Sequence, residues 1–547
     1  MTTPPDEQLD VMIVGAGPTG LTLAAQLQAM GASFRIVDRQ PDRVRESRAL
    51  AIQPRTLEVL RGLGVTRELL ARGNDAVWLR LHAGSRAVRV RLFGLGLADT
   101  AFPFLLFVSQ AETEAVLGDR LSAGGGRVER AVELTAFTAR AEGVTCTLRH
   151  PDGRTEQVVA RYLVGCDGAG SSVRRGAGIP FRGGAYPQTF ALADLEIDNL
   201  DTGEFATDTA HSFLGPDSIL FCFPLGRPAT WRILAMHPSL QRRREPARPS
   251  LEELQALADP LTGGRLRLRD PVWLTYFRLQ HRHATRYRAG PVFLAGDAAH
   301  VHSPAGAQGM NTGIQDAWNL GWKLALVSHG VAAESLLDSY DAERRPVGRF
   351  VVRFTDRAFS AATSTNPLVR TLRTQLVPRV LPLVLRLDRS VAYGFRTISQ
   401  LGISYRHSAA VQEGRPALRR GPRAGDRLPD ARITRHGQGC WLGQALAAPC
   451  FHLLLCGPVD DWDAAQLAAL DRRHPGRLAV HHLTRDAAPA ALHDPDGQAL
   501  ALLGVKQTAH YLIRPDGHIG YRAAGTDLHG LQRHLDHWLP TTTPHPA

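Results

Sequence analysis

Residues 296–311, Gly-Asp-Ala-Ala-His-Val-His-Ser-Pro-Ala-Gly-Ala-Gln-Gly-Met-Asn, carry the strongest indication of the fold. The apolar run 291–295 predicts a buried strand directly before them, and a helix is predicted to begin near Asn311. The carboxylate of Asp297 is therefore placed between a strand and a glycine-rich loop that leads into a helix N-terminus. Backbone N–H groups and the helix dipole attract negative charge at such a place, so we expect a polar, electron-rich ligand here.

The N-terminus carries a second glycine-rich loop in the order strand, loop, helix, strand. The apolar strand 10–14 leads into Gly15, Gly17 and Gly20, and the second strand of the unit ends at Asp38. In this pattern the glycines allow a tight turn and a close approach of backbone N–H groups to a diphosphate, while the acid accepts ribose hydroxyls. The N-terminal segment therefore predicts a dinucleotide-binding βαβ unit.

A third motif lies between these two. It reads Tyr-Leu-Val-Gly-Cys-Asp-Gly over residues 162–168, and Arg174 follows it closely. The sequence shows no second GxGxxG, which a flavoprotein with a separate NAD(P)H-binding domain of this type is expected to have. We therefore expect one nucleotide-binding domain.

The three motifs, in this order, resemble those of the FAD-dependent aromatic hydroxylases. These are the single-component, class A flavoprotein monooxygenases with the para-hydroxybenzoate hydroxylase fold. The similarity is closest to the phenol-, chlorophenol- and hydroxyphenylpropionate-type members and to the aromatic polyketide hydroxylases. By motif order it covers residues 10 to about 410, and a weaker similarity continues to the C-terminus through 425–430 and 512–517.

The resemblance implies an α/β protein built from several domains. A Rossmann-like FAD-binding domain is expected from residues 1–180 and 285–360. The strand-rich segment 181–284 is expected to form an inserted substrate-binding sheet, and 361–420 to form helices that close the site. Residues 421–547 are expected to form a thioredoxin-like domain without redox cysteines, since the sequence has no CxxC.

The resemblance also implies which residues bind the cofactor. The glycine loop would hold the diphosphate of FAD, Asp38 the adenosine ribose and Asp297 the ribityl chain, and the Asp167 motif would serve both FAD and NAD(P)H. The implied FAD-binding residues are Gly15, Gly17, Gly20, Asp38, Arg39, Arg48, Gln110, Asp167, Arg174, Asp297, Gly309, Met310 and Asn311. Arg48 and the backbone of Pro304 are the candidates for a catalytic role, because the resemblance places both beside the flavin.

The implied reaction is the hydroxylation of a phenolic or polycyclic aromatic, polyketide-like substrate. In the family, NADPH or NADH reduces FAD, and dioxygen then forms a flavin C4a-hydroperoxide that transfers oxygen to the ring. The cofactor supplies this chemistry, while the protein orients the substrate and excludes water. Two alternatives stay open: Baeyer–Villiger or epoxidising chemistry on the same fold, and a non-catalytic, flavin-bound scaffold protein.

Few acid–base residues are needed for such a reaction. A base or hydrogen-bond relay would favour the phenolate form of a substrate, and the candidates are His300, His302, His211 and Tyr186. A supporting role in the loop is the competing interpretation for His300 and His302.

Aromatic side chains of the segment 181–284 are candidates for substrate contacts. Large apolar residues on a sheet either line a cavity or fill the core, and the sequence leaves both open. The candidate substrate-binding residues are Phe221, Phe223, Trp231 and Phe277.

The composition limits the other functions. The net charge of +12 rests on scattered arginines without a nucleic-acid-binding module, so we expect no nucleic-acid partner. The six cysteines form no metal-type cluster, so no metal site is expected and free thiols are predicted. No apolar run is long enough to span a bilayer, and no signal peptide is recognised. We expect a cytoplasmic protein, with a homodimer left open.

Overall fold

The computed structural model describes most of the chain. The described residues are 8–43, 49–75, 78–83, 86–91, 97–198, 207–215, 218–226, 229–237, 240, 249–303, 306–363, 366, 372, 388–486 and 488–540. Arg48 and Pro304, both predicted as catalytic, lie outside the described residues. Most of the stretch 364–387, which is part of the predicted closing segment 361–420, also lies outside them. The described strands form three eight-stranded sheets and one small two-stranded sheet.

The first sheet contains the predicted dinucleotide-binding unit. Its central strands run in the order β16-β17-β10-β1-β2-β7, with β9 and β8 extending from β10. Its strands are β1 (Leu9–Val14), β2 (Phe34–Asp38), β7 (Val128–Arg130), β8 (Glu133–Arg140), β9 (Gly143–Arg149), β10 (Thr155–Gly165), β16 (Arg288–Ala289) and β17 (Val292–Leu294). The strands β17, β10, β1 and β2 pair in parallel, so the carboxyl ends that carry all three motifs meet at one edge of the sheet.

Two helices that follow glycine-rich loops pack on this sheet. They are α1 (Pro18–Ala29) and α8 (Gly309–Ser328). The side-chain amide of Gln26 in α1 donates a 3.1 Å hydrogen bond to the carbonyl of Trp318 in α8. A Cβ atom on Gly321 would lie 2.3 Å from Gln26 Oε1. The close packing of the two helices therefore depends on this glycine.

The second sheet has the order β18-β15-β11-β14-β13-β12-β4-β5. Its strands are β4 (Trp78–Ala83), β5 (Arg86–Arg91), β11 (Phe181–Asp198), β12 (Thr209–Leu214), β13 (Ile219–Pro224), β14 (Trp231–Met236), β15 (Arg267–Ala284) and β18 (His300–Val301). The strands β4 and β5 lie within the segment 1–180, which is predicted to bind FAD. They nevertheless belong to the second sheet, because β4 pairs in parallel with β12. The sheet therefore extends beyond the predicted range 181–284.

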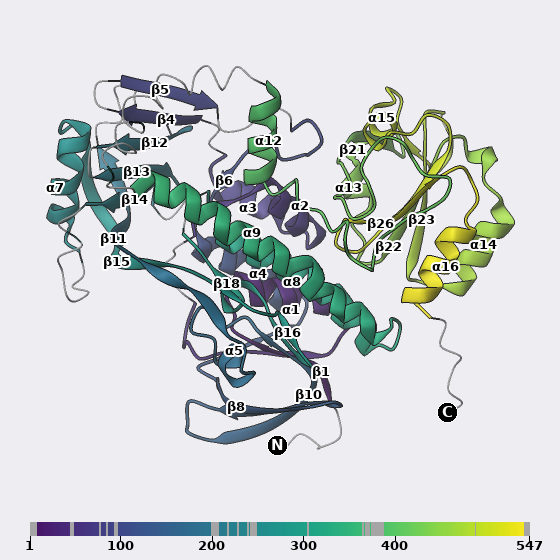
Figure 1. Ribbon diagram of the computed structural model, residues 1–547, viewed down its shortest axis with the longest axis horizontal. Helices are drawn as coiled ribbons and strands as arrows, with labels where there is room; N and C mark the ends of the chain where they lie inside the picture. The colour runs from purple at the N-terminus through teal and green to yellow at the C-terminus, as the bar shows by residue number, and fades with distance from the viewer. Residues whose placement is uncertain are drawn as a thin grey trace.

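Further helices cover the two sheets (Figure 1). The remaining elements of this region are α2 (Pro54–Gly62), α3 (Thr66–Arg72), α4 (Gln110–Ala123), α5 (Ser172–Gly176), α7 (Leu251–Thr262), α9 (Asp338–Thr363), α12 (Asp388–Ile398), and the small sheet of β3 (Ala51–Ile52) and β6 (Leu106–Phe107). The helix α7 covers the outer face of the second sheet, where Leu254 and Ala258 join its core. The long helix α9 crosses both sheets (Figure 1). No described helix is long and apolar enough to cross a membrane.

The C-terminal unit is built around the third sheet, in the order β19-β26-β25-β22-β23-β24-β20-β21. Its elements are β19 (Gln412–Glu413), β20 (Arg432–Arg435), β21 (Gln438–Trp441), α13 (Leu442–Ala445), β22 (Phe451–Cys456), α14 (Ala464–Arg473), β23 (Leu478–Thr484), β24 (Leu492–His493), α15 (Gln498–Leu503), β25 (Ala509–Ile513), β26 (Ile519–Ala524) and α16 (His529–Trp538). Strands β25 and β26 form an antiparallel hairpin, and all six cysteines are free.

Buried charges join this unit to the rest of the molecule. Arg514, after β25, donates hydrogen bonds of 2.7 and 2.9 Å to the carboxylate of Glu343 in α9. Lys323 of α8 donates to the same carboxylate across 2.8 Å. These three side chains are almost fully excluded from solvent. Arg514, in the turn after β25, therefore supplies part of the positive charge that balances the buried carboxylate of Glu343 in α9.

Candidate active site

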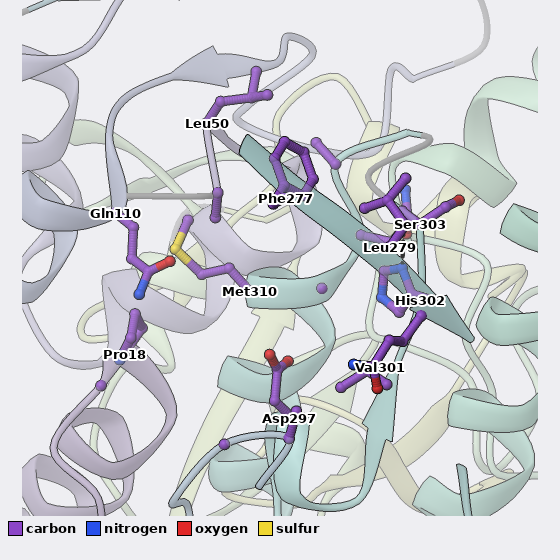
Figure 2. A pocket seen from close by; sticks show the side chains of 18 of the residues that line it. Pro18, Leu50, Gln110, Phe277, Leu279, Asp297, Val301, His302, Ser303 and Met310 are labelled. Carbon is purple, nitrogen blue, oxygen red and sulfur yellow. Dashed lines mark hydrogen bonds between the residues drawn. The ribbon is translucent and has the colours of Figure 1, made fainter. Parts of the chain in front are cut away.

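A cavity of about 310 Å³ lies where the first and second sheets meet (Figure 2). One wall comes from the glycine loop of α1, the Asp167 motif and the loop before α8, and the opposite wall comes from the second sheet. The lining residues are Gly17, Pro18, Thr19, Ala49, Leu50, Ala51, Gln110, Cys166, Gly168, Ala169, Leu192, Leu234, Phe277, Arg278, Leu279, Gln280, Asp297, Val301, His302, Ser303, Ala307, Gln308, Gly309 and Met310.

The three motif glycines, of which Gly15 and Gly17 precede α1 and Gly20 lies in its first turn, serve two purposes. Gly15 has φ +102°, and a Cβ there would lie 2.3 Å from the carbonyl oxygen of Cys166. A Cβ on Gly20 would lie 1.9 Å from the oxygen of Gly15. A Cβ on Gly17 would meet only Glu114 Oε1, at 4.0 Å, and α1 has no side-chain cap at its N-terminus. Gly15 and Gly20 therefore build the turn, whereas Gly17 leaves open space in front of unpaired helix N–H groups.

Asp38 ends β2 beside this loop. Its carboxylate accepts hydrogen bonds from the main-chain N–H groups of Ala16, across 2.7 Å, and Gln40, across 2.8 Å. Arg130 of β7 lies 3.8 Å from the same carboxylate. Arg39, the next residue, is exposed. The acid is thus held against the glycine loop, at the strand end where the motif places a ribose ligand.

Asp297 lines the cavity beside the start of α1. The short turn Gly296–Ala298 follows β17, and the Asp297 side chain points into the cavity (Figure 2). Gly296 has φ +63°, and a Cβ there would lie 2.6 Å from Thr19 Oγ1 of α1. A glycine is therefore needed for the strand to turn beneath α1 and present the carboxylate.

The N-terminus of α8 borders the same cavity. No side chain caps this helix, and Gly309 and Met310 line the cavity. The buried side chain of Asn311 donates to the carbonyls of Ala51, across 2.9 Å, and Ala307, across 2.7 Å. Asn311 thus fixes the helix start against the neighbouring segment, and the unpaired N–H groups of the first turn face a space suited to a group with negative charge.

The Asp167 motif supports the cavity mainly from behind. The carboxylate of Asp167 accepts hydrogen bonds from Ser172 N, across 2.7 Å, and Val173 N, across 3.2 Å, at the start of α5. Arg174 donates to the carbonyls of Ala298, across 2.9 Å, and Ala169, across 2.8 Å. Burial lowers the pKa of Arg174. Asp167 therefore holds the start of α5, and Arg174 holds Ala169 and the turn that carries Asp297. The small residues of the motif line the cavity.

Gln110, for which a cofactor contact is predicted, is the first residue of α4 and lines the cavity. The preceding Ser109 caps the helix by accepting a hydrogen bond from Glu112 N across 3.2 Å. The side-chain amide of Gln110 donates to Glu114 Oε1 across 2.8 Å. Its position on the first turn is thus fixed by a capped helix.

The second sheet brings only part of the predicted aromatic set to the cavity. Phe277 lines it, together with Leu192 and Leu234 (Figure 2). Phe221 and Phe223 stack with ring centroids 5.7 Å apart on the same side of the sheet, next to the lining residues rather than among them.

Trp231 is not brought to the cavity. It is fully buried and packs in the core beneath α7 with Ile233 and Ala235 of its own strand, whereas Leu234 of β14 faces the cavity. Side chains alternate between the two faces of a strand, so Trp231 lies on the opposite face from Leu234. The expectation of a substrate contact is therefore corrected to a core position.

The four candidate bases differ in their access to the cavity. His300 is buried, and its Nε2 lies 2.7 Å from the carboxylate of Asp316. It does not line the cavity. His302 lines it; its Nδ1 is 2.8 Å from the carbonyl of Ser303, and burial lowers its pKa to about 4. A neutral His302 with Nδ1 protonated would donate to that carbonyl and leave Nε2 as an acceptor.

The other two candidates lie outside the cavity lining. His211 pairs with His82 at 3.1 Å, and burial lowers its pKa to about 3. The Tyr186 hydroxyl donates to Asp356 across 2.6 Å, and burial raises its pKa. Of the four candidates, His302 alone lines the cavity.

Sequence reasoning missed a buried ion pair that joins the two walls. Arg232 of β14 donates to both carboxylate oxygens of Asp194 in β11, at 2.6 and 2.7 Å, and to the carbonyl of Ala49 across 2.7 Å. Charged residues inside an otherwise apolar strand pair are a visible signal, since buried charges are rare unless paired. The contact fixes the segment Ala49–Ala51 that lines the cavity.

The residues of the cavity fit a flavin dinucleotide. Two helix N-termini without side-chain caps face it, a loop glycine leaves room for a diphosphate, and the Asp297 side chain points into it. Helix N–H groups suit the diphosphate of FAD, and a carboxylate suits its ribityl hydroxyls. The fold and the site together define an FAD-dependent enzyme.

Comparison with known families agrees with this class. The family model described as "FAD binding domain" matches residues 8–355, and the one described as "Aromatic-ring hydroxylase, C-terminal" matches residues 421–541. The chain belongs to the FAD-dependent aromatic hydroxylase family. It is an FAD-dependent monooxygenase, and it uses FAD together with dioxygen and a reduced nicotinamide nucleotide.

Relatives and solved structures extend over nearly the whole chain. The 6-methylpretetramide 4-monooxygenase of Streptomyces rimosus is 36% identical over 97% of this chain and 94% of its own length. The pentachlorophenol 4-monooxygenase of Sphingobium chlorophenolicum is 31% identical over 78% of this chain and 76% of its own. The structure of the anhydrotetracycline hydroxylase OxyS from Streptomyces rimosus aligns with a TM-score of 0.77 at 30% identity, covering 98% of this chain and all of that one.

Proposed function

We propose that this enzyme hydroxylates a polycyclic, polyketide-like phenol, with NAD(P)H as reductant and dioxygen as the oxygen source. The observation that carries the proposal is the shared cavity, which has FAD-binding features on one wall and Leu192, Leu234 and Phe277 on the other. A flat apolar wall facing a flavin site suits an aromatic ring system. Relatives that are named for tetracycline-type substrates support the polycyclic class.

FAD supplies the oxygen-transfer chemistry when bound, by the peroxide route that the family resemblance implies. We propose that Gly15, Gly17 and Gly20 admit its diphosphate, that Asp38 binds the adenosine ribose and that Asp297 binds the ribityl chain. The N–H groups at the start of α8 would stabilise negative charge on the pyrimidine side by roughly 0.3–1 kcal/mol, or about 2 kcal/mol when partly buried.

The residues of the chain itself would orient the substrate and exclude water. Phe277 and Leu234 would cover one face of the substrate, while neutral His302 offers a hydrogen-bond acceptor in the same cavity. A hydroxyl that donates to His302 would be fixed in the plane of the ring and made more electron-rich. We also propose Gln110, Gly309 and Met310, which line the cavity, as FAD contacts, and Arg39 beside Asp38 as another.

The test is a substrate screen on purified, FAD-loaded enzyme that follows NADPH and NADH oxidation with product analysis. Labelled dioxygen identifies the inserted atom, and NMR of the product separates ring hydroxylation from lactone or epoxide formation. A hydroxylated polycyclic product carrying one labelled oxygen is expected. Insertion next to a ketone would assign Baeyer–Villiger chemistry instead, and a chain that takes up no FAD on reconstitution would remove the basis of the proposal.

A further inference from the structure

One carboxylate holds the segment that joins the first and second sheets. The strand β17 of the first sheet leads into the turn Gly296–Ala298, which carries Asp297, and the chain enters β18 of the second sheet at His300. Oδ2 of Asp316 in α8 accepts a hydrogen bond from Gly296 N across 3.1 Å and lies 2.7 Å from Nε2 of His300. A single oxygen therefore contacts both ends of the segment that carries Asp297. We name Gly296, His300 and Asp316 the turn clamp.

The carboxylate of Asp316 is fully buried and paired with an arginine. Nε of Arg344 in α9 donates to its other oxygen, Oδ1, across 2.7 Å. Burial alone would raise the pKa of Asp316, but Arg344 and His300 hold it below its usual value. A charged carboxylate can only accept hydrogen bonds, so Nε2 of His300 must carry the proton that it donates. The turn clamp is thus made of hydrogen bonds to a charged acceptor, which are stronger than those between neutral groups.

The helix α8 can lie against the turn because Gly313 has no side chain. A Cβ atom there would lie 3.1 Å from Cα of Gly296. Gly313 is one helical turn before Asp316, on the same side of α8. Nη2 of Arg344 also donates to the carbonyl of Thr312 across 3.1 Å, in the first turn of the helix. The turn clamp and its arginine therefore fix the turn relative to the N-terminus of α8.

The turn clamp lies behind the cavity wall and can affect the cavity through the turn that it holds. Gly296, His300, Asp316 and Arg344 do not line the cavity, whereas Asp297 does. A buried ion pair adds little stability over well-packed apolar side chains, because the loss of hydration offsets the attraction. Directed hydrogen bonds instead select one arrangement of the groups that they join. The group whose arrangement matters to the cavity is the Asp297 carboxylate, which points into it (Figure 2).

We propose that Asp316 and His300 are positioning residues for Asp297. They hold its carboxylate at one place relative to the N-terminus of α8, so that FAD meets an acceptor that is already oriented. The inference rests on the proposed binding of the ribityl chain by Asp297. Without the turn clamp, FAD would have to order the turn as it binds, and that cost would be measured as weaker affinity.

A double-mutant cycle on FAD affinity tests the proposal. The Kd is measured by adding FAD to the apoproteins of wild type, Asp316→Asn, Asp297→Ala and the double variant. Asp316→Asn should raise the Kd roughly tenfold in wild type, since residues of one hydrogen-bond network are coupled to about this extent. It should raise the Kd at most about twofold in the Asp297→Ala background, because the carboxylate that it positions is missing. A role in the fold alone would weaken FAD binding by the same factor in both backgrounds.

Asp430→Asn is the matched control. Asp430 is also a buried acid that accepts hydrogen bonds from an arginine, Arg61 Nη1, and from a glycine N–H, that of Gly443, each across 2.8 Å. It does not line the cavity. Asp430→Asn should lower the Tm of the apoprotein and change the FAD Kd less than about twofold, with or without Asp297, because distant sites act independently.

Histidine variants decide the question if Asp316→Asn does not fold. His300→Phe removes the donor at one end of the segment and leaves the pair of Asp316 and Arg344 intact. It should raise the Kd when Asp297 is present and not in the Asp297→Ala background, and His300→Gln should raise it less, because the amide can still donate. Equal factors in both backgrounds for Asp316→Asn and His300→Phe overturn the proposal. An Asp297→Ala variant that binds FAD as tightly as wild type overturns the proposed role of Asp297 instead, so the two failures are distinguishable.

Discussion

Arg232 Nη1 donates a 2.7 Å hydrogen bond to the main-chain oxygen of Ala49. The donor belongs to the second sheet and the acceptor to the segment that borders the flavin side of the cavity. The guanidinium reaches Ala49 with its charge already balanced by Asp194. The buried Arg232–Asp194 ion pair therefore links the two walls of the cavity through the bond from Arg232 to Ala49.

Replacing Arg232 with leucine should lower the free energy of unfolding by roughly 3–5 kcal/mol. The buried carboxylate of Asp194 would lose its counter-charge and keep only the Trp273 Nε1 donor, across 2.9 Å. FAD should also dissociate faster, since Ala49 loses its anchor. Urea unfolding and flavin release measure both effects. Arg269→Leu is the control on the same sheet: its pair with Asp198 is half-exposed, and such pairs contribute only about 0–1 kcal/mol. Equal losses in the two variants would contradict the assignment.

Asp297→Ala should weaken FAD retention roughly 10- to 150-fold, because it removes a charge-assisted hydrogen bond of about 1.5–3 kcal/mol. Asp297→Asn should retain more flavin than the alanine variant, since an amide oxygen still accepts a hydrogen bond. Flavin content after gel filtration and the Kd from reconstitution give the comparison. Asp461→Ala removes an exposed acid of the C-terminal unit as a control. Full flavin content in Asp297→Ala would show that this carboxylate does not contact the cofactor.

Gly17→Ala should fold with nearly wild-type stability and bind FAD poorly. The added methyl group has only Glu114 Oε1 within 4.0 Å in the protein, yet it would occupy the space through which the diphosphate approaches the helix N-terminus. Thermal unfolding without flavin and FAD affinity separate these two effects. Gly118→Ala in α4, where a Cβ meets nothing within 4 Å, should change neither flavin binding nor the fold. Undiminished FAD affinity in Gly17→Ala would place the diphosphate elsewhere.

Acid should destabilise the first sheet partly through Glu156. Hydrogen bonding from Arg35, opposed by desolvation and helped by His150, lowers the pKa of Glu156 from 4.5 to about 2. A carboxyl with a depressed folded-state pKa contributes its stability above the unfolded pKa and loses it as the pH falls through the folded pKa. The loss should therefore occur between about pH 4.5 and 2.

The measurement for Glu156 is urea unfolding at several pH values in that window, with wild type and Glu156→Gln side by side. The variant should start with lower stability and lose less of it on acidification. Parallel curves for the two proteins would mean that the carboxylate titrates alike in the folded and unfolded states. Glu133→Gln, which removes a more exposed acid from β8, serves as the control.

The first sheet was largely predictable because its signals are local. Strand β1, the glycine loop and α1 follow from apolar periodicity and turn chemistry. The helix α8 begins at Gly309, two residues before its predicted start. A loop glycine at a helix N-terminus gives no local signal for the first helical residue, because Gly is poor in helix propensity.

Long-range pairing explains what the sequence did not predict. The face on which Trp231 lies depends on the register of β14 against β11 and β13, and a shift of one residue reverses every side chain. The joining of β4 to β12 links segments far apart in the chain. The carboxylate of Asp167 was assigned to ligand binding by its motif, but its hydrogen bonds to α5 depend on a local turn that the motif alone does not reveal.

The shared carboxylate of Glu343 has a consequence for how the chain can be divided. A protein cut after residue 420 would keep Glu343 and Lys323 and lose Arg514, the donor of two of the bonds that satisfy this buried acid. In the intact molecule, the buried charge of Glu343 is thus stabilised in part by Arg514, which lies far along the chain. The unit that holds Arg514 contributes no residue to the cavity lining. The C-terminal unit is in this sense part of the interior of the catalytic region, and evolutionary loss of it would require a compensating change in α9.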